Sequence, residues 1–437
     1  MLQYDSNTKQ IIGTTGGYRP EGLMIRDIYV HLGFIMKGMH CMLYEPVVPT
    51  EKSRIGIIAI HSDDDYSLIH LGGELAKRGY RVLCGQVSDA HATLDAKMLD
   101  IREAVEFMRA YPGIEKVILM GHSGGATLMS AYQAAAENGP ELFQRDNYLI
   151  KCSITEKLPA ADGIMTLDSN WGNGAMTLFS IDPAVIEEGN GMKLDPELDV
   201  FNPANGYDPE GSTYSESFLK KFFAAQAERN NAIIRRALDR LEAIESGKGN
   251  YVDDEPFNVT AAVQIKPCNK LFPEDLRLLS HTKQEYKLLH KDGSATFEII
   301  RSLRRPLGGR SMTPSSQACI MDTVRSYLTN RAVMAGEDYC VNEDGAEGIL
   351  YENTYSCTPG NIRYIKAPLL VMGMTGGYEF LASETVYHNA ASEDKSIAFM
   401  EGAGHNFDNE GRTEFGDTEK VVFDYLDEWL GKPGRFL

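Results

Sequence analysis

Long hydrophobic runs and an excess of positive charge are both missing from this sequence. No apolar run approaches the roughly 20 residues that a transmembrane helix needs, so we expect no membrane-spanning segment. The 43 Lys and Arg residues are outnumbered by 62 Asp and Glu residues, which gives a net charge of −19. Nucleic acid and an anionic membrane surface would repel such a chain, so neither is expected as a partner.

Cysteines are also few, and none is spaced as CxxC. The seven cysteines are an odd number at low density, which favours a reducing, cytoplasmic location over a disulfide framework. The first residues contain no basic segment followed by an apolar one, so we expect no signal peptide. Repeats and low-complexity segments are absent from the sequence as well. The chain therefore has the composition of a globular protein, and 437 residues suffice for one large domain with an insertion, or for two domains.

The most informative motif lies at residues 117–125. An apolar run leads into Gly-x-Ser-x-Gly, and residues 126–131 then have a helical pattern. A strand that turns into a helix through this motif is a nucleophile elbow, which exposes the hydroxyl of Ser123. Side chains at Gly121 or Gly125 would crowd the neighbouring strand or helix. The first amides of the helix would face negative charge that forms beside Ser123.

Apolar runs alternate with amphipathic stretches on both sides of the elbow. A continuous apolar run such as residues 55–60 is typical of a central parallel strand that is buried on both faces. The alternation predicts a parallel α/β sheet. Expected strands are 25–34, 40–44, 55–60, 80–86, the elbow strand, 163–167, 368–373 and 396–400; expected helices are 69–78, 93–111, the elbow helix to about residue 138, and 418–430.

Residues 169 to about 362 break the alternation. Residues 215–245 form one long helical pattern. We interpret 274–289 and 316–335 as further segments of a helical and irregular region. Nothing in this part of the sequence resembles a buried parallel strand. We therefore expect a large, mainly helical cap inserted into the sheet domain. This divides the chain into a first core part at 1–168, a cap at 169–362 and a second core part at 363–437.

Five segments resemble the α/β-hydrolase fold family. They are the strand end at 61–62, residues 78–82, the elbow at 121–125, the strand at 368–373, and Glu-Gly-Ala-Gly-His at 401–405. The resemblance covers roughly residues 22–168 and 363–437. It implies a mostly parallel central sheet flanked by helices, a catalytic order of serine, acid and histidine, and no cofactor or metal. The insertion matches no known pattern, so no substrate is implied.

The resemblance also implies a catalytic triad. A serine hydroxyl needs a base, and His405 follows the last expected strand, where the family carries its catalytic histidine. The family usually has an aspartate about three residues beyond the strand that ends at 373, but this position is Gly376 here. The acid is therefore open among three carboxylates.

Spacing favours Glu379 as the acid that orients His405. It precedes His405 by 26 residues, close to the family's usual separation, whereas Glu384 precedes it by 21. Glu384 also lies near an expected helix start, where a glutamate simply complements the helix dipole. The third candidate is Asp168, directly after the strand at 163–167. We predict a Ser123–His405–Glu379 triad, with Glu384 second and Asp168 third.

The oxyanion hole should use two backbone amides. One is Gly124, and the other by match to the family is Asp63, although Ser62 replaces the family's glycine. The acidic run 63–65 is expected to be a solvated loop rather than a metal site. The residues expected near the substrate are His61, Ser62, His122 and Trp171, with the His122 side chain itself pointing away from the reacting face.

Arginines gather within the insertion of this acidic protein, at positions 301, 304, 305 and 310. They are either a docking site for a substrate carboxylate or phosphate, or a solvated surface. The sequence as a whole predicts a serine hydrolase that cleaves an ester of a small or medium organic molecule. Lactone, thioester and carbon–carbon bond hydrolysis use the same triad, and a non-catalytic ligand-binding member of the fold is the alternative from another class. A homodimer is compatible with these expectations.

Overall fold

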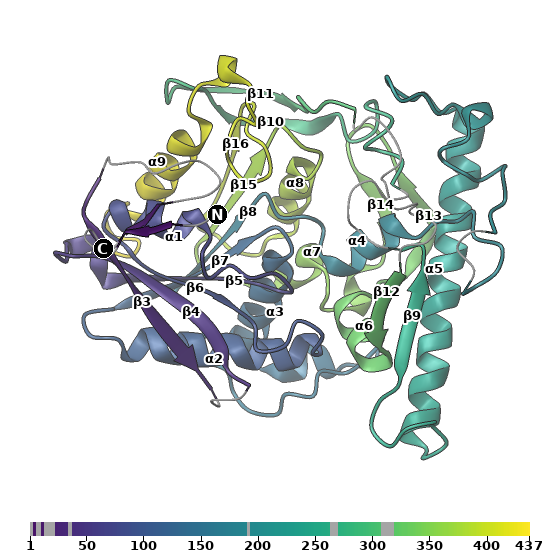
Figure 1. The fold of residues 1–437 in the computed structure, drawn as a ribbon, viewed down its shortest axis with the longest axis horizontal. Helices are drawn as coiled ribbons and strands as arrows, with labels where there is room; N and C mark the ends of the chain where they lie inside the picture. The colour runs from purple at the N-terminus through teal and green to yellow at the C-terminus, as the bar shows by residue number, and fades with distance from the viewer. Residues whose placement is uncertain are drawn as a thin grey trace.

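A ten-stranded mixed sheet runs through the molecule (Figure 1). The computed structural model describes residues 3–5, 10–12, 22–33, 37–189, 193–262, 270–306 and 319–437. The strand order is β11-β10-β16-β15-β8-β7-β5-β6-β4-β3. The strands from β10 to β6 in that order are parallel, and β11, β4 and β3 are antiparallel to their neighbours. The bounds are β3 Ile25–Leu32, β4 Met39–Pro46, β5 Ile55–His61, β6 Arg81–Gln86, β7 Lys116–His122, β8 Gly163–Leu167, β10 His281–Leu289, β11 Ala295–Arg301, β15 Leu369–Met374 and β16 Lys395–Met400.

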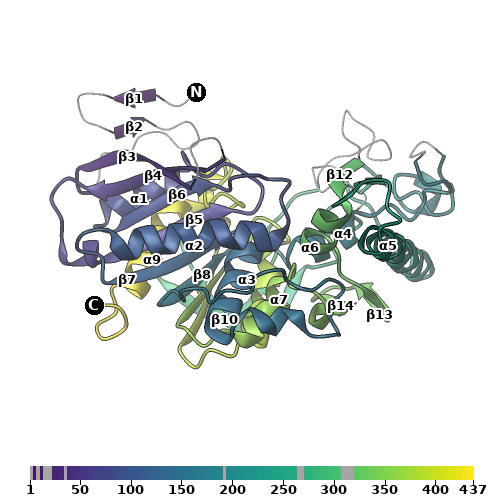
Figure 2. The same cartoon turned by 90° about the horizontal axis from the view of Figure 1, so that it is seen from below.

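Helices cover both faces of this sheet, because its central strands are apolar on both sides. Along β5, Ile58 and Ile60 enter one core together with α2 and α3, whereas Ile57 and Ala59 enter a second core together with α1 and α9. Figure 2 shows α2 and α3 on one side of the sheet. The strands and helices expected at residues 25–168 and 368–430 are confirmed within the described residues, and residue 34, the expected end of the first strand, lies outside them. The helices are α1 His70–Lys77, α2 Leu94–Ala110, α3 Gly125–Asn138, α8 Phe380–Asn389 and α9 Thr418–Leu430.

Residues 169–362 leave the sheet after β8 and place most of their elements at one end of the molecule, at the right of Figure 1. We call them the inserted region. The long helix α5 begins where Ser215 Oγ accepts a hydrogen bond from the Phe218 amide, as its capping pattern requires. Two short antiparallel strand pairs, β9–β12 and β13–β14, lie beside it. The bounds are α4 Asn173–Ser180, α5 Glu216–Glu245, β9 Pro256–Thr260, β12 Cys319–Thr323, α6 Val324–Asn330, β13 Ala335–Val341, β14 Ala346–Ile349 and α7 Thr358–Asn361.

The helical interpretation of residues 274–289 is wrong. Residues 281–289 form β10, which pairs in parallel with β16 and joins the central sheet. Thr282, Tyr286 and Leu288 share the buried face at strand spacing, and Asp292-Gly293 closes the hairpin to β11 with Gly293 at a φ of 80°. That turn signal was present in the sequence. The inserted region therefore contributes two strands to the main sheet.

The second helical interpretation, at residues 316–335, is wrong in part. Residues 319–323 form β12, which pairs with β9, and only residues 324–330 are helical as α6. Residues 316–318 lie outside the described part of the chain. A five-residue strand followed directly by a two-turn helix has no clear single periodicity, which explains the error.

Two expected absences can be compared with the structure. Among the helices that the structure describes, none combines the length and the apolarity needed to cross a membrane. The six cysteines within the described ranges are all free thiols, and Cys268 lies outside those ranges.

Candidate active site

Ser123 lies on a strained turn between β7 and α3. Its φ is 55°, in the left-handed region that residues with side chains seldom adopt. A Cβ on Gly121 would lie 2.4 Å from the Cα of Ala126, so only glycine allows the strand and the helix to approach so closely. The turn thus has the geometry of a nucleophile elbow, and it places Ser123 at the carboxyl ends of the parallel strands.

His405 follows β16 and carries two carboxylates at one ring nitrogen. Its Nδ1 lies 2.7 Å from Asp168 Oδ2 and 2.8 Å from Glu379 Oε2. Asp168 comes directly after β8, and Glu379 is the N-cap residue of α8, which follows β15. Three strand ends therefore meet here. Since Nδ1 carries at most one proton, the two acids compete for a single hydrogen bond.

The two carboxylates differ in how they are held. Asp168 is 1% exposed, and its Oδ1 accepts a 2.8 Å hydrogen bond from the Met374 amide. The Glu379 side chain is 16% exposed. Asp168 is therefore the more deeply buried partner of His405, and Glu379 is the one nearer to solvent.

Glu384 is not brought to His405. It is buried on α8, where its carboxylate accepts the amides of Lys283 at 3.0 Å and of Gln284 at 3.1 Å. It thereby holds the first residues of β10 against α8. The spacing along the chain gave no sign of this, because β10 was not recognised as a strand.

The electrostatics of the group follow from burial and from the shared nitrogen. Burial alone would lower the pKa of His405, but the charge of Glu379 and the hydrogen bonds to both carboxylates raise this pKa well above its ordinary value. Burial raises the pKa of Asp168 to about 6 against the opposing hydrogen bond from His405, and the charge of Glu379 adds to the increase. Asp168 and His405 therefore titrate together.

Ser123, Asp168, Glu379 and His405 line one cavity of about 460 Å³. This volume lies within the range typical of small-molecule sites. The wall is unusually rich in cations for an acidic protein. It contains Lys270, Arg304, Arg305 and Arg412, together with Asn170, Met176, Pro273, Pro306, Gly376, Gly377, Tyr378 and Glu410. Of the four arginines singled out in the sequence, Arg304 and Arg305 are in this wall, Arg301 is not, and Arg310 lies outside the described residues.

The two expected oxyanion amides belong to segments that touch. A Cβ on Gly124 would lie 2.9 Å from Asn173 Oδ1 and 3.1 Å from His61 Nε2, so both side chains pack directly against the Gly124 backbone. The amide of Asp63 lies 3.3 Å from His61 Nδ1, and Asp63 Oδ1 lies 2.9 Å from the same nitrogen. An amide donates only to a nitrogen without a proton and a carboxylate accepts only from one with a proton, so only one of these two contacts is a hydrogen bond at any one time.

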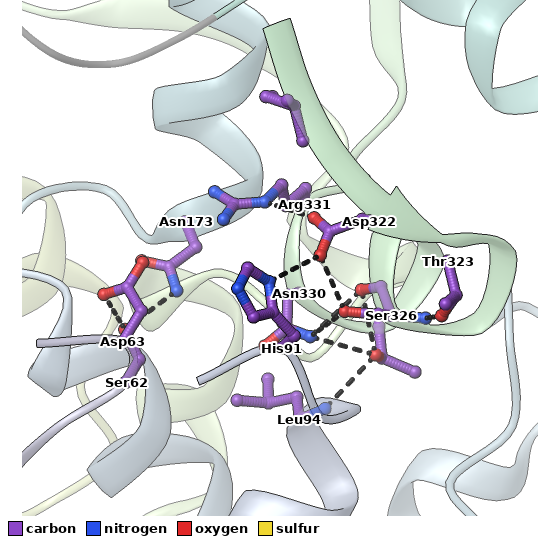
Figure 3. A network of polar contacts seen from close by, with 12 residues as sticks. Ser62, Asp63, His91, Leu94, Asn173, Asp322, Thr323, Ser326, Asn330 and Arg331 are labelled. Atoms are coloured by element: carbon purple, nitrogen blue, oxygen red, sulfur yellow. Dashed lines mark hydrogen bonds and ion pairs between the residues drawn. The ribbon is translucent and has the colours of Figure 1, made fainter. Parts of the chain in front are cut away.

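Asp63 is about one-third exposed, with 37% of its side chain accessible, and it keeps its charge. Burial alone would raise its pKa, but the hydrogen bond from His61 and the charges of His61, Arg331 and Lys97 hold that pKa well below its usual range. Figure 3 shows Asp63 with Ser62 and Asn173, whose Nδ2 donates to Ser62 Oγ at 3.1 Å. Among the described residues, the carboxylate and imidazole group with the spacing of metal ligands is Asp168, Glu379 and His405, not the run 63–65. A cation there would displace the proton on Nδ1.

His122 supports the histidine loop from behind. Its Nε2 lies 2.8 Å from the His405 carbonyl oxygen, which can only accept, so Nε2 carries the proton. Nδ1 then accepts from the Tyr66 hydroxyl at 2.6 Å. Burial, followed by the charge of His405, lowers the pKa of His122 well below its usual value. Sequence reasoning missed Tyr66, whose only signal was its place shortly after the strand end at His61.

Of the four residues expected near the substrate, none is in the cavity wall. Trp171 is fully buried, with Nε1 donating to Thr385 Oγ1 at 3.2 Å and its ring edge-on to Phe179. His61 packs against the Gly124 backbone, Ser62 Oγ accepts from Asn173, and His122 Nε2 donates to the His405 carbonyl oxygen. These side chains shape the elements around the cavity rather than its surface.

A mostly parallel sheet flanked by helices, with a serine on a strand-to-helix elbow followed along the chain by an acid and a histidine, is the α/β-hydrolase fold. This chain has that fold, as the resemblance in its sequence implied. Comparison of the sequence with protein-family models finds no match, and comparison with curated proteins finds none either.

Solved structures resemble this fold at low sequence identity. Est1E from Butyrivibrio proteoclasticus is 10% identical with a TM-score of 0.40, over 92% of this chain and 98% of that one. A soluble variant of monoglyceride lipase from Saccharomyces cerevisiae, in complex with a substrate analogue, is 12% identical with a TM-score of 0.41, over 92% and 94%. Brefeldin A esterase, a bacterial homologue of human hormone-sensitive lipase, is 10% identical with a TM-score of 0.42, over 96% and 80%. A fold shared at this level does not fix the reaction.

Proposed function

We propose that this protein is a serine hydrolase that cleaves a carboxylic ester of a small or medium organic molecule through an acyl-enzyme. The observation that carries the proposal is the cavity, in which the elbow serine and a carboxylate-bound histidine line the same wall. A serine becomes nucleophilic when a nearby base removes its proton, and His405 is the base in this wall.

The proposed reaction has two halves, formation and hydrolysis of the acyl-enzyme, and each catalytic group acts once in each half. His405 Nε2 takes the proton of Ser123 Oγ, which bonds to the carbonyl carbon of the ester. The amide of Gly124 stabilises the oxyanion that forms, and the amide of Asp63 joins it on release from His61 Nδ1. Collapse breaks the bond to the alcohol oxygen, which leaves with the proton from His405. Water then releases the acid from Ser123 by the same steps in reverse order.

We propose that Asp168 fixes the ring orientation of His405, because it is fully buried directly after β8 and lies 2.7 Å from Nδ1 of His405. Glu379, the acid favoured by spacing, adds a second negative charge at the same nitrogen. Such a charge stabilises the imidazolium that forms when Ser123 attacks, and it also favours protonation of the free enzyme. The roles of these two acids are separable by mutation, as argued in the Discussion.

The inserted region is proposed to act as a cap over Ser123. Seven of the cavity-lining residues belong to it, and four of them are Met176, Lys270, Arg304 and Arg305. We therefore expect substitutions there to change which esters are accepted more than the rate on a minimal acetate ester. A cytoplasmic location and a homodimer remain predictions.

A fluorophosphonate probe tests the proposed chemistry directly. It should label Ser123 covalently, and Ser123→Ala should lose both the label and about a millionfold in ester hydrolysis while keeping the fold. Ser246→Ala, at an exposed site beyond α5, is the matched control and should retain both. A panel of carboxylic ester, lactone, thioester and β-diketone substrates identifies the bond that is cleaved. A non-catalytic binding protein would remain unlabelled and hydrolyse none of them.

A further inference from the structure

The cavity wall brings four cationic side chains together in a protein of net negative charge. Lys270, Arg304, Arg305 and Arg412 line it, although the chain carries a net charge of −19. Of the three carboxylates in the same wall, Asp168 and Glu379 are engaged at His405, and Glu410 lies 4.0 Å from Arg412 Nη2. The negative charge that neutralises the arginines must therefore come from other groups.

Arg304 is held only by neutral groups. Its guanidinium donates to the carbonyl oxygens of Leu279 at 2.6 Å and Phe272 at 3.0 Å, and also to the Leu278 carbonyl and the Ser302 hydroxyl. Within the described ranges no carboxylate forms an ion pair with Arg304, and its Nε is buried without a hydrogen-bond partner. The charge of Asp275 reaches Arg304, but Asp275 is itself paired with Arg277, so the partly buried Arg304 would gain from an anion that enters from outside.

Arg305 and Arg412 differ in what they contact. Arg412 is buried, and it donates to the carbonyl oxygens of Leu303 at 2.9 Å and Gly402 at 2.8 Å, so it ties two segments together. Arg305 is exposed, and in the described part of the chain it makes neither a hydrogen bond nor an ion pair. Its donors are therefore open to a molecule that enters the cavity.

We propose that the substrate is an ester that bears a second, anionic group, a carboxylate, bound by Arg305 in the field of Arg304 and the buried Lys270. This inference rests on the proposed hydrolase function. A guanidinium presents two parallel N–H groups that match the two oxygens of a carboxylate. Ser123 and Arg305 line one cavity of about 460 Å³, which has room for a small dicarboxylic acid monoester.

The test compares two substrates of equal length. The 4-nitrophenyl monoester of glutaric acid carries the second carboxylate, and the 4-nitrophenyl methyl diester of the same acid does not. Wild type should have the higher kcat/KM for the monoester. Arg305→Gln should lower the monoester-to-diester ratio of kcat/KM by about 10- to 100-fold, the usual effect of a charged hydrogen bond. Arg301→Gln, outside the cavity wall, is the matched control and should leave the ratio unchanged.

A binding measurement separates this inference from the proposed chemistry. Glutarate, titrated in a calorimeter into the Ser123→Ala protein, should bind. Adding the Arg305→Gln substitution to that protein should raise the Kd for glutarate by a similar factor. If wild type hydrolyses both esters with the same kcat/KM, or Arg305→Gln leaves both the ratio and the glutarate Kd unchanged, the anion site is refuted and the hydrolase stands. If glutarate binds through Arg305 but neither ester is cleaved and Ser123 is not labelled, the anion site is supported and the hydrolase function fails.

Discussion

At the scale of single residues, the group around His405 determines the expected pH dependence. Glu379 and Asp168 together raise the pKa of His405 well above its ordinary value. A general base acts in its unprotonated form, so a raised pKa moves the acid limb of the rate profile upward. As the pH is lowered, we therefore expect activity to begin to fall while the pH is still above about 6.5, where an ordinary imidazole would be mostly neutral.

Substitution of the two acids should have opposite signatures. Glu379→Gln removes one negative charge, lowers the pKa of His405 and shifts the acid limb of kcat/KM to lower pH, with a modest loss of rate at alkaline pH. Asp168→Asn removes the fixed orienting partner and should cost about 10⁴-fold in kcat, since an amide can hold the wrong tautomer. The measurement is kcat/KM against pH for wild type and both variants, with Glu384→Gln as the control away from His405.

The reverse ranking would restore the assignment based on spacing. If Glu379→Gln loses several orders of magnitude and Asp168→Asn little, then Glu379 is the orienting acid and Asp168 the auxiliary charge. An acid limb that does not move in Glu379→Gln would show that this carboxylate does not set the pKa of His405.

At the scale of elements, the elbow depends on the close approach of β7 and α3. A Cβ at position 121 would overlap the backbone of α3 at Ala126, and neither element can move without moving Ser123. Gly121→Ala should therefore destabilise the protein by about 1–3 kcal/mol or more and abolish turnover. Urea denaturation and ester hydrolysis measure the two effects.

A glycine in a roomier place provides the control for this substitution. Gly73 lies within α1, and a Cβ there would meet only Ile25 Cδ1 at 3.7 Å, an ordinary contact. Gly73→Ala should stabilise the protein by roughly 0.5–1 kcal/mol, because alanine loses less entropy in a helix. Equal stability of Gly121→Ala and wild type would mean that the elbow is less tightly packed than the structure shows.

At the scale of the whole molecule, a polar network joins the inserted region to the sheet domain beside the oxyanion segment (Figure 3). Lys97 on α2 donates to Asn330 Oδ1 at 3.2 Å, and Arg331 Nε lies 2.7 Å from Asp322 Oδ2, whose side chain is 3% exposed. Burial lowers the pKa of Lys97 to about 8, while the charge of Asp63 opposes this. The charges of Lys97 and Arg331 thus reach Asp63, whose amide is a proposed oxyanion donor.

Loss of Arg331 should therefore affect both stability and turnover. Arg331→Gln leaves Asp322 buried with less compensation, so we expect a loss of about 1–3 kcal/mol in unfolding free energy. It should also lower kcat for charged and neutral esters alike, because it acts on the oxyanion segment rather than on the substrate. Arg325→Gln is the matched control, since Arg325 pairs with the exposed Glu245 at 3.3 Å and should contribute little. Unchanged kcat in Arg331→Gln would separate the network from catalysis.

The sequence by itself determined the parts of this protein that depend on local pattern. Continuous apolar runs marked the central strands, because strands buried on both faces leave no place for polar residues. Gly121, Ser123 and Gly125 marked the elbow, since the turn has steric requirements that few residues meet. His405 was indicated by its place after the last strand, in agreement with where the structure puts it.

Only the tertiary structure decided what depends on distant segments. Spacing along the chain only ranked Glu379, Glu384 and Asp168 as candidates. In the structure, three strand ends bring Asp168 and Glu379 to Nδ1 of His405, whereas Glu384 binds β10. The strand at 281–289 was missed because its pairing with β16 spans more than a hundred residues of chain. Likewise, the four neighbouring arginines cannot be told apart by sequence pattern. Only the fold places Arg305 in the cavity wall and Arg301 outside it. The reason is that packing, and not local pattern, determines which side chains share a cavity.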